Sequence, residues 1–250
     1  MGKTDAIAEA LPAASILLVR DGSLGLEVLM MERAKTMRFA PGAFVFPGGK
    51  VDREDMEVER WKDRVNATLV TEDLCYRVAA LRELYEEASV LLTQNNNEAI
   101  DLKKNFEDHF VASENVLDVE GLQPFAHWVT PETMPRRFNT YFYIAAHNGQ
   151  EAIQDGDEAV SLKWVRPQEL LEDWDSDQVP LMFPTRLNLI KLARAKTVSE
   201  ALLQAKSSNV ARTMPVVKKD ENGVSVVIDA AAGYGVTEAT EKELRIERPN

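Results

Sequence analysis

The chain has 250 residues, 45% of them hydrophobic, which is enough for a globular fold with a sizeable core. Asp and Glu number 41 against 29 Lys and Arg, and the net charge of −12 argues against nucleic acid and anionic membranes as partners. The single cysteine allows no internal disulfide and favours a reducing compartment, so we expect a cytoplasmic protein. An anionic ligand would need a local basic site or a metal ion.

The first apolar run, residues 10–19, contains Pro12 and is too short to span a bilayer or to serve as a good signal peptide. It predicts a strand over 14–20 that ends in a turn at Asp21-Gly22. Further strands are predicted over 26–33 and 43–47.

The middle of the chain is highly charged. Residues 54–70 fit an exposed helix or an insertion. Thr71 is predicted to cap a helix that runs to about Ser89, with Glu72 and Asp73 in its first turn. Residues 98–120 predict an acidic, amphipathic helical connector.

Strand patterns resume in the second half, over 124–130, 139–147 and 159–165. Three helices follow, over 168–174, 184–196 and 198–206. Residues 215–229 predict a hairpin that turns at 221–223. Without a repeat or a low-complexity linker, the pattern favours a single α/β domain with helices on both sides of a mixed sheet.

The helix predicted through residues 77–89 carries an unusual acidic stripe. Glu83, Glu86 and Glu87 share one face at helical spacing, and Ala79 and Ala80 accompany them. The opposite face suits a core and consists of Leu81, Leu84, Tyr85, Ala88, Leu91 and Leu92. Three neighbouring carboxylates repel one another, so the stripe is either a solvated acidic surface or a site for a cation.

A second motif decides between these interpretations. Residues 44–55 read FVFPGGKVDRED, and the Gly48-Gly49 pair lets the backbone approach a ligand closely. With RELYEEASV at 82–90, this segment resembles the Nudix box. Gly49 opens the box, and Asp55 stands where the pattern has Glu. The sequence departs from the pattern in two further ways. The gap between Asp55 and Arg82 is 26 residues instead of seven, an insertion of 19, and Ser89 stands in place of glycine.

The resemblance implies a Nudix-type α/β/α sandwich with a mixed central sheet and extra C-terminal helices. It places the core at about 12–200, an insertion at 56–74 and a C-terminal extension at 201–250. It also implies hydrolysis that depends on Mg²⁺ or Mn²⁺. By the family pattern, the metal ligands are Glu83, Glu86 and Glu87; Arg82 orients a glutamate, and Glu158 is a fourth ligand or the general base. Asp155 and Asp157 are the alternatives to Glu158, all three being turn residues otherwise. A homodimer is the family's habit.

Residues 31–55 and 128–145 extend the resemblance to a branch that contains the peroxisomal coenzyme A and acyl-CoA diphosphatases and their bacterial relatives. This branch implies a small-molecule substrate that is cut to 3′,5′-ADP and an (acyl-)phosphopantetheine. Other Nudix substrates remain alternatives: ADP-ribose, nucleotide sugars and dinucleotides. A non-catalytic nucleotide-binding regulator is a further alternative, although retention of all three carboxylates argues for an enzyme.

Basic residues gather between positions 33 and 53, which suggests a rim that faces phosphate. Within it, Arg33 and Arg38 are candidates for the 3′-phosphate of coenzyme A, with solubilising surface charge as the alternative. The remaining candidate substrate contacts are Phe46, Gly48, Gly49 and Arg137. The three histidines lack zinc-site spacing, and the four tryptophans are expected to pack in the core.

Overall fold

The computed structural model describes residues 7–34, 36, 40–67, 72–94, 104–110, 115–154, 159–221, 223–240 and 243. Eight strands form one mixed sheet: β1 (Ala10–Gly22), β2 (Gly25–Arg33), β3 (Phe44–Val45), β4 (Gly48–Lys50), β5 (Gln123–Val129), β6 (Arg137–Ala146), β7 (Ala159–Val165) and β8 (Arg212–Thr213). A second sheet contains β9 (Val216–Asp220), β10 (Gly223–Val227) and β11 (Glu238–Thr240). The helices are α1 (Val58–Trp61), α2 (Leu74–Ala88), α3 (Pro167–Asp175), α4 (Phe183–Leu192) and α5 (Val198–Ser207), with 3₁₀ turns η1 (Phe106–Phe110) and η2 (Ala230–Ala232).

The long strand β1 organises the large sheet, whose order is β3-β2-β1-β6-β5-β8. It runs parallel to β6 along ten residue pairs, from Ala10 with Arg137 to Val19 with Ala146. On its other side, its last residues pair with β2 and its middle pairs with β4, both antiparallel. Strand β7 adds to β2. The sheet is therefore mixed, as predicted.

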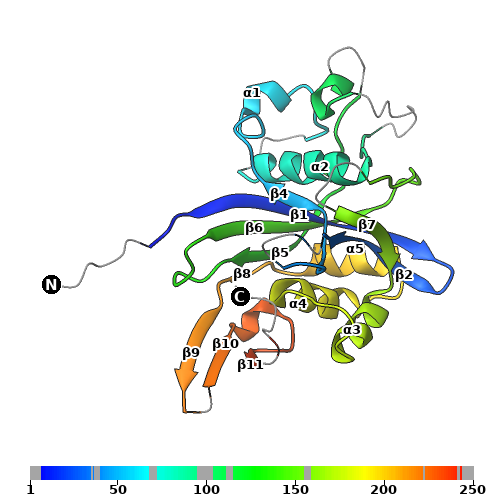
Figure 1. The fold of residues 1–250 in the computed structure, drawn as a ribbon. Coiled ribbons are helices and arrows are strands. Elements are labelled where there is room, and N and C mark those ends of the chain that lie inside the picture. Colours follow the sequence, from blue (N-terminus) through cyan, green and yellow to red (C-terminus); the bar gives the residue numbers. More distant parts are fainter. Residues whose placement is uncertain are drawn as a thin grey trace.

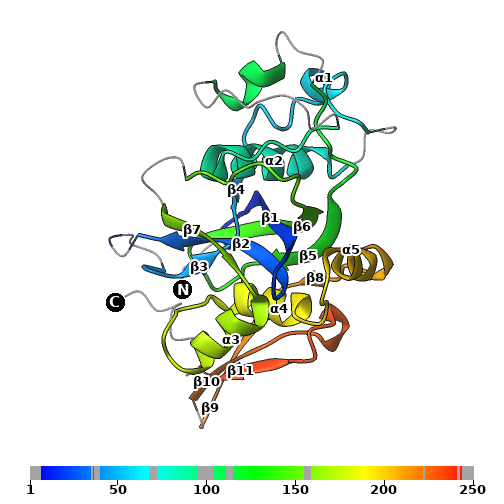
Figure 2. The ribbon, with the colours of Figure 1, turned by 90° about the vertical axis from the view of Figure 1, so that its right-hand side faces the viewer.

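Helices cover both faces of this sheet, which confirms the predicted α/β/α sandwich. Figure 1 shows α2 on one face and α3, α4 and α5 on the other, and Figure 2 shows the same layers after a quarter turn. Each face has its own hydrophobic cluster. Alternate β1 residues supply the two clusters, with Ile16 and Leu18 toward α2 and Leu17 and Val19 toward α4, because successive strand side chains point to opposite faces.

A further layer lies beyond α2, on the side away from the sheet (Figure 1). We call it the outer layer and define it as residues 56–67, 104–110 and 115–122, which include α1 and η1. Its buried side chains join the α2 cluster: Trp61, Val65, Phe106, Phe110, Leu117, Val119 and Leu122. Helix α2 therefore has protein on two sides.

The predicted helices of this region are much shorter than expected. Only Val58–Trp61 is helical in the described part of 54–70, and only Phe106–Phe110 forms a 3₁₀ turn in that of 98–120. Leu117 instead makes isolated β-bridges with Val65 and Thr93. The segment 54–70 was predicted to be exposed if helical, whereas Trp61 and Val65 are buried against the α2 cluster. Short segments that pack on an existing helix need no helix of their own.

Two boundaries also differ from the prediction. Strand β1 begins at Ala10 and continues through Asp21-Gly22, because β6 supplies a parallel partner along its first residues. Helix α2 starts at Leu74, with Asp73 at its N-cap position and Glu72 before the helix; the predicted cap, Thr71, lies outside the described residues. The Asp73 carboxylate does not cap the helix but accepts hydrogen bonds from Arg77 and Tyr143.

The predicted C-terminal hairpin is confirmed by the antiparallel pairing of β9 with β10, in which Asp220 faces Gly223. Residues of this region, among them Val226, Tyr234 and Ala239, belong to the same cluster as α4. The C-terminal extension thus packs against the core of the large sheet. Among the described residues, no helix combines the length and the apolar character needed to cross a membrane.

Candidate active site

The Pro-Gly-Gly corner, residues 47–49, lies next to α2. Both of its glycines are required by close contacts. Gly48 has φ +152° and faces β1, where an added Cβ would stand 2.4 Å from the Ala14 carbonyl oxygen. A Cβ on Gly49 would stand 2.4 Å from Oε1 of Glu83. The corner therefore admits the backbone of β1 on one side and the Glu83 carboxylate on the other, which no larger residue would allow.

The three glutamates of the acidic stripe are all on α2, but their surroundings differ. Glu83 is packed against Gly49, with 15% of its side chain exposed. Glu87 accepts a hydrogen bond of 2.8 Å from the Gly48 N–H. Glu86 is the exposed member of the three. Ala79 and Ala80, expected beside this stripe, are fully buried, because the helix is enclosed by the sheet and the outer layer.

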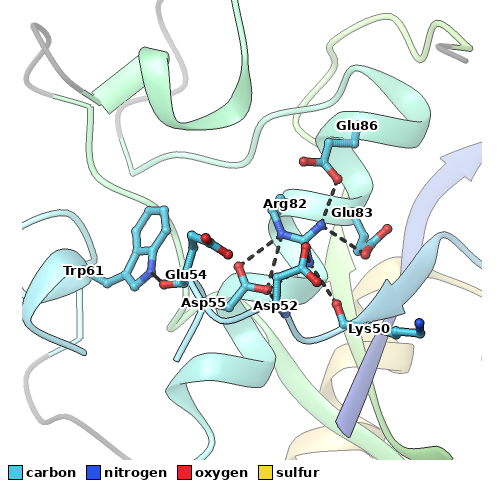
Figure 3. Close-up of polar contacts among 8 residues, drawn as sticks. All are labelled: Lys50, Asp52, Glu54, Asp55, Trp61, Arg82, Glu83 and Glu86. Carbon is cyan, nitrogen blue, oxygen red and sulfur yellow. Dashed lines mark hydrogen bonds and ion pairs between the residues drawn. The ribbon is translucent and has the colours of Figure 1, made fainter. Parts of the chain in front are cut away.

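Arg82 is the centre of the charged network, as Figure 3 shows. Its Nη1 donates to Glu83 Oε1 at 3.1 Å and to Glu86 Oε2 at 2.8 Å. Its Nη2 donates to the Lys50 carbonyl oxygen at 2.9 Å, which ties α2 to the end of β4. The Arg82–Glu86 pair is thus one part of a larger cluster, and the predicted role of Arg82 in orienting a glutamate has a geometric basis.

Asp55 holds the other side of this arginine. Its side chain is fully buried, and its two carboxylate oxygens accept from Arg82 Nε at 3.1 and 3.3 Å and from Nη2 at 2.9 Å. The Asp52 N–H also donates to Asp55, at 2.8 Å. Although burial alone lowers the pKa of Arg82, the hydrogen bonds and charge of Asp55 raise it above its ordinary value. Asp55 therefore forms an ion pair across the 26-residue gap.

Glu83 is the carboxylate of this network whose pKa is raised. Burial raises its pKa to about 7; the Arg82 charge lowers it in part, and the Glu86 charge raises it further. The positive charge of Arg82 is therefore not sufficient to offset the burial of this carboxylate. Perturbed carboxylates of this kind are common where a protein binds a cation or performs acid–base chemistry.

The chemistry of these oxygen donors fits Mg²⁺ or Mn²⁺, which are hard cations. Within the part of the chain that the structure describes, no three His, Cys, Asp or Glu side chains are already gathered as metal ligands. The reason is visible in the network: Glu83 and Glu86 both contact Arg82, while Glu87 contacts Gly48. The three glutamates are neighbours on the helix, but their carboxylate oxygens accept hydrogen bonds from Arg82 and Gly48.

The other predicted substrate contacts are not brought together with the glutamates. Phe46 is buried and packs edge-on against Phe142 in the cluster of the opposite sheet face. Arg137 is also buried, and it donates to the carbonyl oxygens of Thr130 and Ala8, which fixes the N-terminal end of β1. The Phe46 ring is packed against another ring, and the buried Arg137 cation has hydrogen-bond acceptors, so both side chains have structural roles.

Arg33 lies at the end of β2 and is half-buried, and its backbone pairs with Ala43 and Gly42. The remaining predicted residues lie outside the described residues: Arg38, Asp155, Asp157 and Glu158.

Ser89, which replaces the glycine of the family pattern, ends α2 with φ +55°, so serine fills the left-handed position. Sequence reasoning missed Trp61, whose indole N–H donates to the Glu54 carbonyl oxygen, next to Asp55, at 2.9 Å. The high charge of the 54–70 segment gave no signal that its one large aromatic residue is buried beside the site.

Comparison with known proteins agrees with this geometry. The NUDIX domain model matches residues 10–183. Acyl-coenzyme A diphosphatase NUDT19 of Xenopus laevis is 23% identical over 260 residues, covering 79% of this chain and 68% of that protein. Putative nudix hydrolase 7 of Caenorhabditis elegans is 31% identical over 195 residues, covering 74% of this chain and 61% of that protein.

Among solved structures, a NUDIX hydrolase from Alicyclobacillus acidocaldarius is similar, with a TM-score of 0.69 and 29% identity. The match covers 79% of this chain and 97% of that one. These matches support the prediction that the protein is an enzyme of the diphosphatase type. The family model covers well over half of the chain, and the chain therefore belongs to the Nudix hydrolase family.

Proposed function

We propose that the protein hydrolyses the diphosphate bond of coenzyme A or an acyl-CoA, giving 3′,5′-ADP and an (acyl-)phosphopantetheine. The observation that carries this proposal is the placement of Glu83 and Glu87 over the Gly48-Gly49 corner, with Glu86 beside them through Arg82. The choice of substrate class is supported by the likeness to NUDT19, whose name states an acyl-coenzyme A diphosphatase.

In this reaction a water oxygen bonds to one phosphorus of the diphosphate, and the bond between that phosphorus and the bridging oxygen breaks. The water proton leaves to a base, and two phosphate monoesters result. Glu83, Glu86 and Glu87 would hold Mg²⁺ or Mn²⁺, which when bound neutralises the diphosphate charge and promotes attack by water.

The other residues of the proposed site position the glutamates or contact the substrate. The Gly48-Gly49 corner lets the Glu83 carboxylate lie close to the backbone, and Arg82 and Asp55 fix the helix that carries the glutamates. Arg33, at the end of β2, is our candidate for the 3′-phosphate. Glu158 stays a prediction as a fourth ligand or the general base.

The test is to incubate the protein with Mg²⁺ or Mn²⁺ and a panel of coenzyme A, acyl-CoAs, ADP-ribose, nucleotide sugars and dinucleotides, and to identify products by mass. We expect cleavage of coenzyme A derivatives to 3′,5′-ADP. Preference for another member would change the substrate, and no product from any member would favour a nucleotide-binding regulator.

Glu87→Gln is the matching variant, because it removes the charge of a proposed ligand and keeps its size. We expect turnover to fall by about 10³-fold or more, with an unchanged urea unfolding midpoint. Near-normal turnover in this variant would refute the assignment of the site.

A further inference from the structure

The side chain of Trp61 links the outer layer to the loop that holds Asp55. Trp61 is 1% exposed, at the end of α1, and it belongs to the segment inserted between the two halves of the box. Its ring packs against Phe106 in a tilted arrangement, with the ring centroids 5.8 Å apart, and against Phe110 in a T-shaped arrangement at 6.4 Å. The ring is thus anchored in the outer layer.

The outer layer is in turn fixed to α2. Phe106 packs on Tyr85, with ring centroids 6.0 Å apart, and Tyr85 lies on α2 between Glu83 and Glu86. The Tyr85 hydroxyl donates to the Lys104 carbonyl oxygen at 2.7 Å and lies 2.8 Å from His109 Nε2. The aromatic residues that hold Trp61 are therefore packed directly against the helix of the glutamates.

The edge of the same indole reaches the loop that holds Asp55. Its N–H donates to the Glu54 carbonyl oxygen at 2.9 Å, and that oxygen also accepts from the Glu57 N–H at 3.2 Å. Asp55 follows immediately, and its carboxylate contacts Arg82, which contacts Glu83 and Glu86 (Figure 3). A shift of the Glu54 carbonyl would move Asp55 relative to Arg82.

We propose that Trp61 is a positioning residue of the metal-binding site: its indole N–H fixes the Glu54 carbonyl, and this holds Asp55 against Arg82 and so sets the orientation of Glu83 and Glu86. The inserted segment then contributes to function through this one hydrogen bond. This inference rests on the proposed metal-dependent function. Groups one step removed from a metal ligand commonly change metal affinity by about 10- to 100-fold, and Trp61 acts at a greater remove.

The molecule offers a matched control on the other face of the sheet. Trp128 is also buried, and its indole N–H also donates within the protein, to the Tyr234 hydroxyl at 2.8 Å. It lies in the cluster of α4 and contacts none of the charged residues around Arg82 in the interactions described here. Trp61→Phe and Trp128→Phe each keep an apolar ring and delete a buried hydrogen bond.

The experiment measures Mn²⁺ binding directly, by electron paramagnetic resonance of the free ion, in the wild type and both variants. Urea unfolding midpoints and the Mg²⁺ concentration for half-maximal turnover are measured in parallel. We expect both variants to lose stability to a similar extent. Only Trp61→Phe should weaken Mn²⁺ binding, by about tenfold, and raise the Mg²⁺ requirement while the substrate KM changes little.

Wild-type affinity for Mn²⁺ in Trp61→Phe, or equal weakening in Trp128→Phe, would overturn the proposal. If Trp61→Phe does not fold, incorporation of 3-benzothienylalanine at position 61 keeps the shape of the ring and removes only the N–H, with the same replacement at 128 as its control. A wild type that binds Mn²⁺ without hydrolysing any substrate would refute the proposed function alone. One that binds no Mn²⁺ would refute both.

Discussion

The two faces of the large sheet have similar apolar clusters but different networks of buried polar groups. On the α4 face, Trp128, Tyr234 and Asn188 form a neutral hydrogen-bonded chain with both links at 2.8 Å. On the α2 face, buried Arg82 and Asp55 form an ion pair that extends to Glu83 and Glu86. The α4 face also holds buried charge, since Arg186 pairs with Glu243 at 3.2 Å. What distinguishes the α2 face is that Asp55, Glu83 and Glu86 all converge on one arginine. Such concentrations of perturbed charge are common at functional sites.

The strongest test of this contrast is Asp55→Ala. It leaves the buried Arg82 without its main partner, so we expect the free energy of unfolding to fall by about 3–5 kcal/mol, measured by urea denaturation. Asp52→Ala is the control, because the Asp52 carboxylate is 58% exposed and stands 3.7 Å from Arg82. It should cost less than about 1 kcal/mol. Equal losses would mean that the buried pair has no special weight.

Gly49→Ala tests whether the corner positions a glutamate. The new methyl group would stand 2.4 Å from Glu83 Oε1 and force that carboxylate to move. A displacement of about 1 Å at a reacting site can reduce turnover by about 10²-fold, which is the loss we expect in steady-state assays.

The control is Gly22→Ala, whose methyl group would press on the Glu27 carboxylate at the same 2.4 Å. Glu27 pairs with Arg20 at the β1–β2 turn and belongs to no part of the proposed site. Turnover should therefore be unchanged in this variant. A similar loss in both would show that Gly49 acts only through general strain.

Tyr234→Phe breaks the neutral chain of the α4 face. It leaves the Trp128 N–H and Oδ1 of Asn188 without this partner, so we expect a loss of about 1–3 kcal/mol in the free energy of unfolding. Mn²⁺ affinity and turnover should remain those of the wild type. A loss of metal affinity here would contradict the division of labour between the two faces.

The pH dependence of the metal-free protein should reveal Glu83. Its pKa of about 7 lies above the ordinary 4.5, so the folded state holds the proton more tightly than the unfolded state does. The contribution of Glu83 to stability is thus present below pH 4.5 and is lost as pH rises through 7, at up to about 1.4 kcal/mol per pH unit. Urea titrations at pH 5 to 8 should show this loss in the wild type and not in Glu83→Gln.

Much of this architecture could be predicted because patterns within short segments of the sequence indicate it. Alternating and helical apolar patterns identified all the longer strands and helices, and the spacing of Glu83, Glu86 and Glu87 placed them on one side of α2. The outer layer could not be predicted. Its residues are charged, its helical turns are short, and its burial depends on contacts between positions far apart, such as Trp61 with Phe106. Arg137 and Phe46 show the same limit, since only tertiary packing determines whether a side chain is buried.

Asp55 and Arg82 are 27 positions apart in sequence, yet their side chains are in contact. This contact closes the intervening chain, which includes α1 and the start of α2, into a loop with fixed ends. The entropy of closing such a loop grows only with the logarithm of its length, so extending it from seven residues to 26 costs about 1 kcal/mol. Burying Trp61 and Val65 offsets that cost several times over. The ion pair therefore marks a point where this fold can accept new sequence without disturbing the helix of the glutamates.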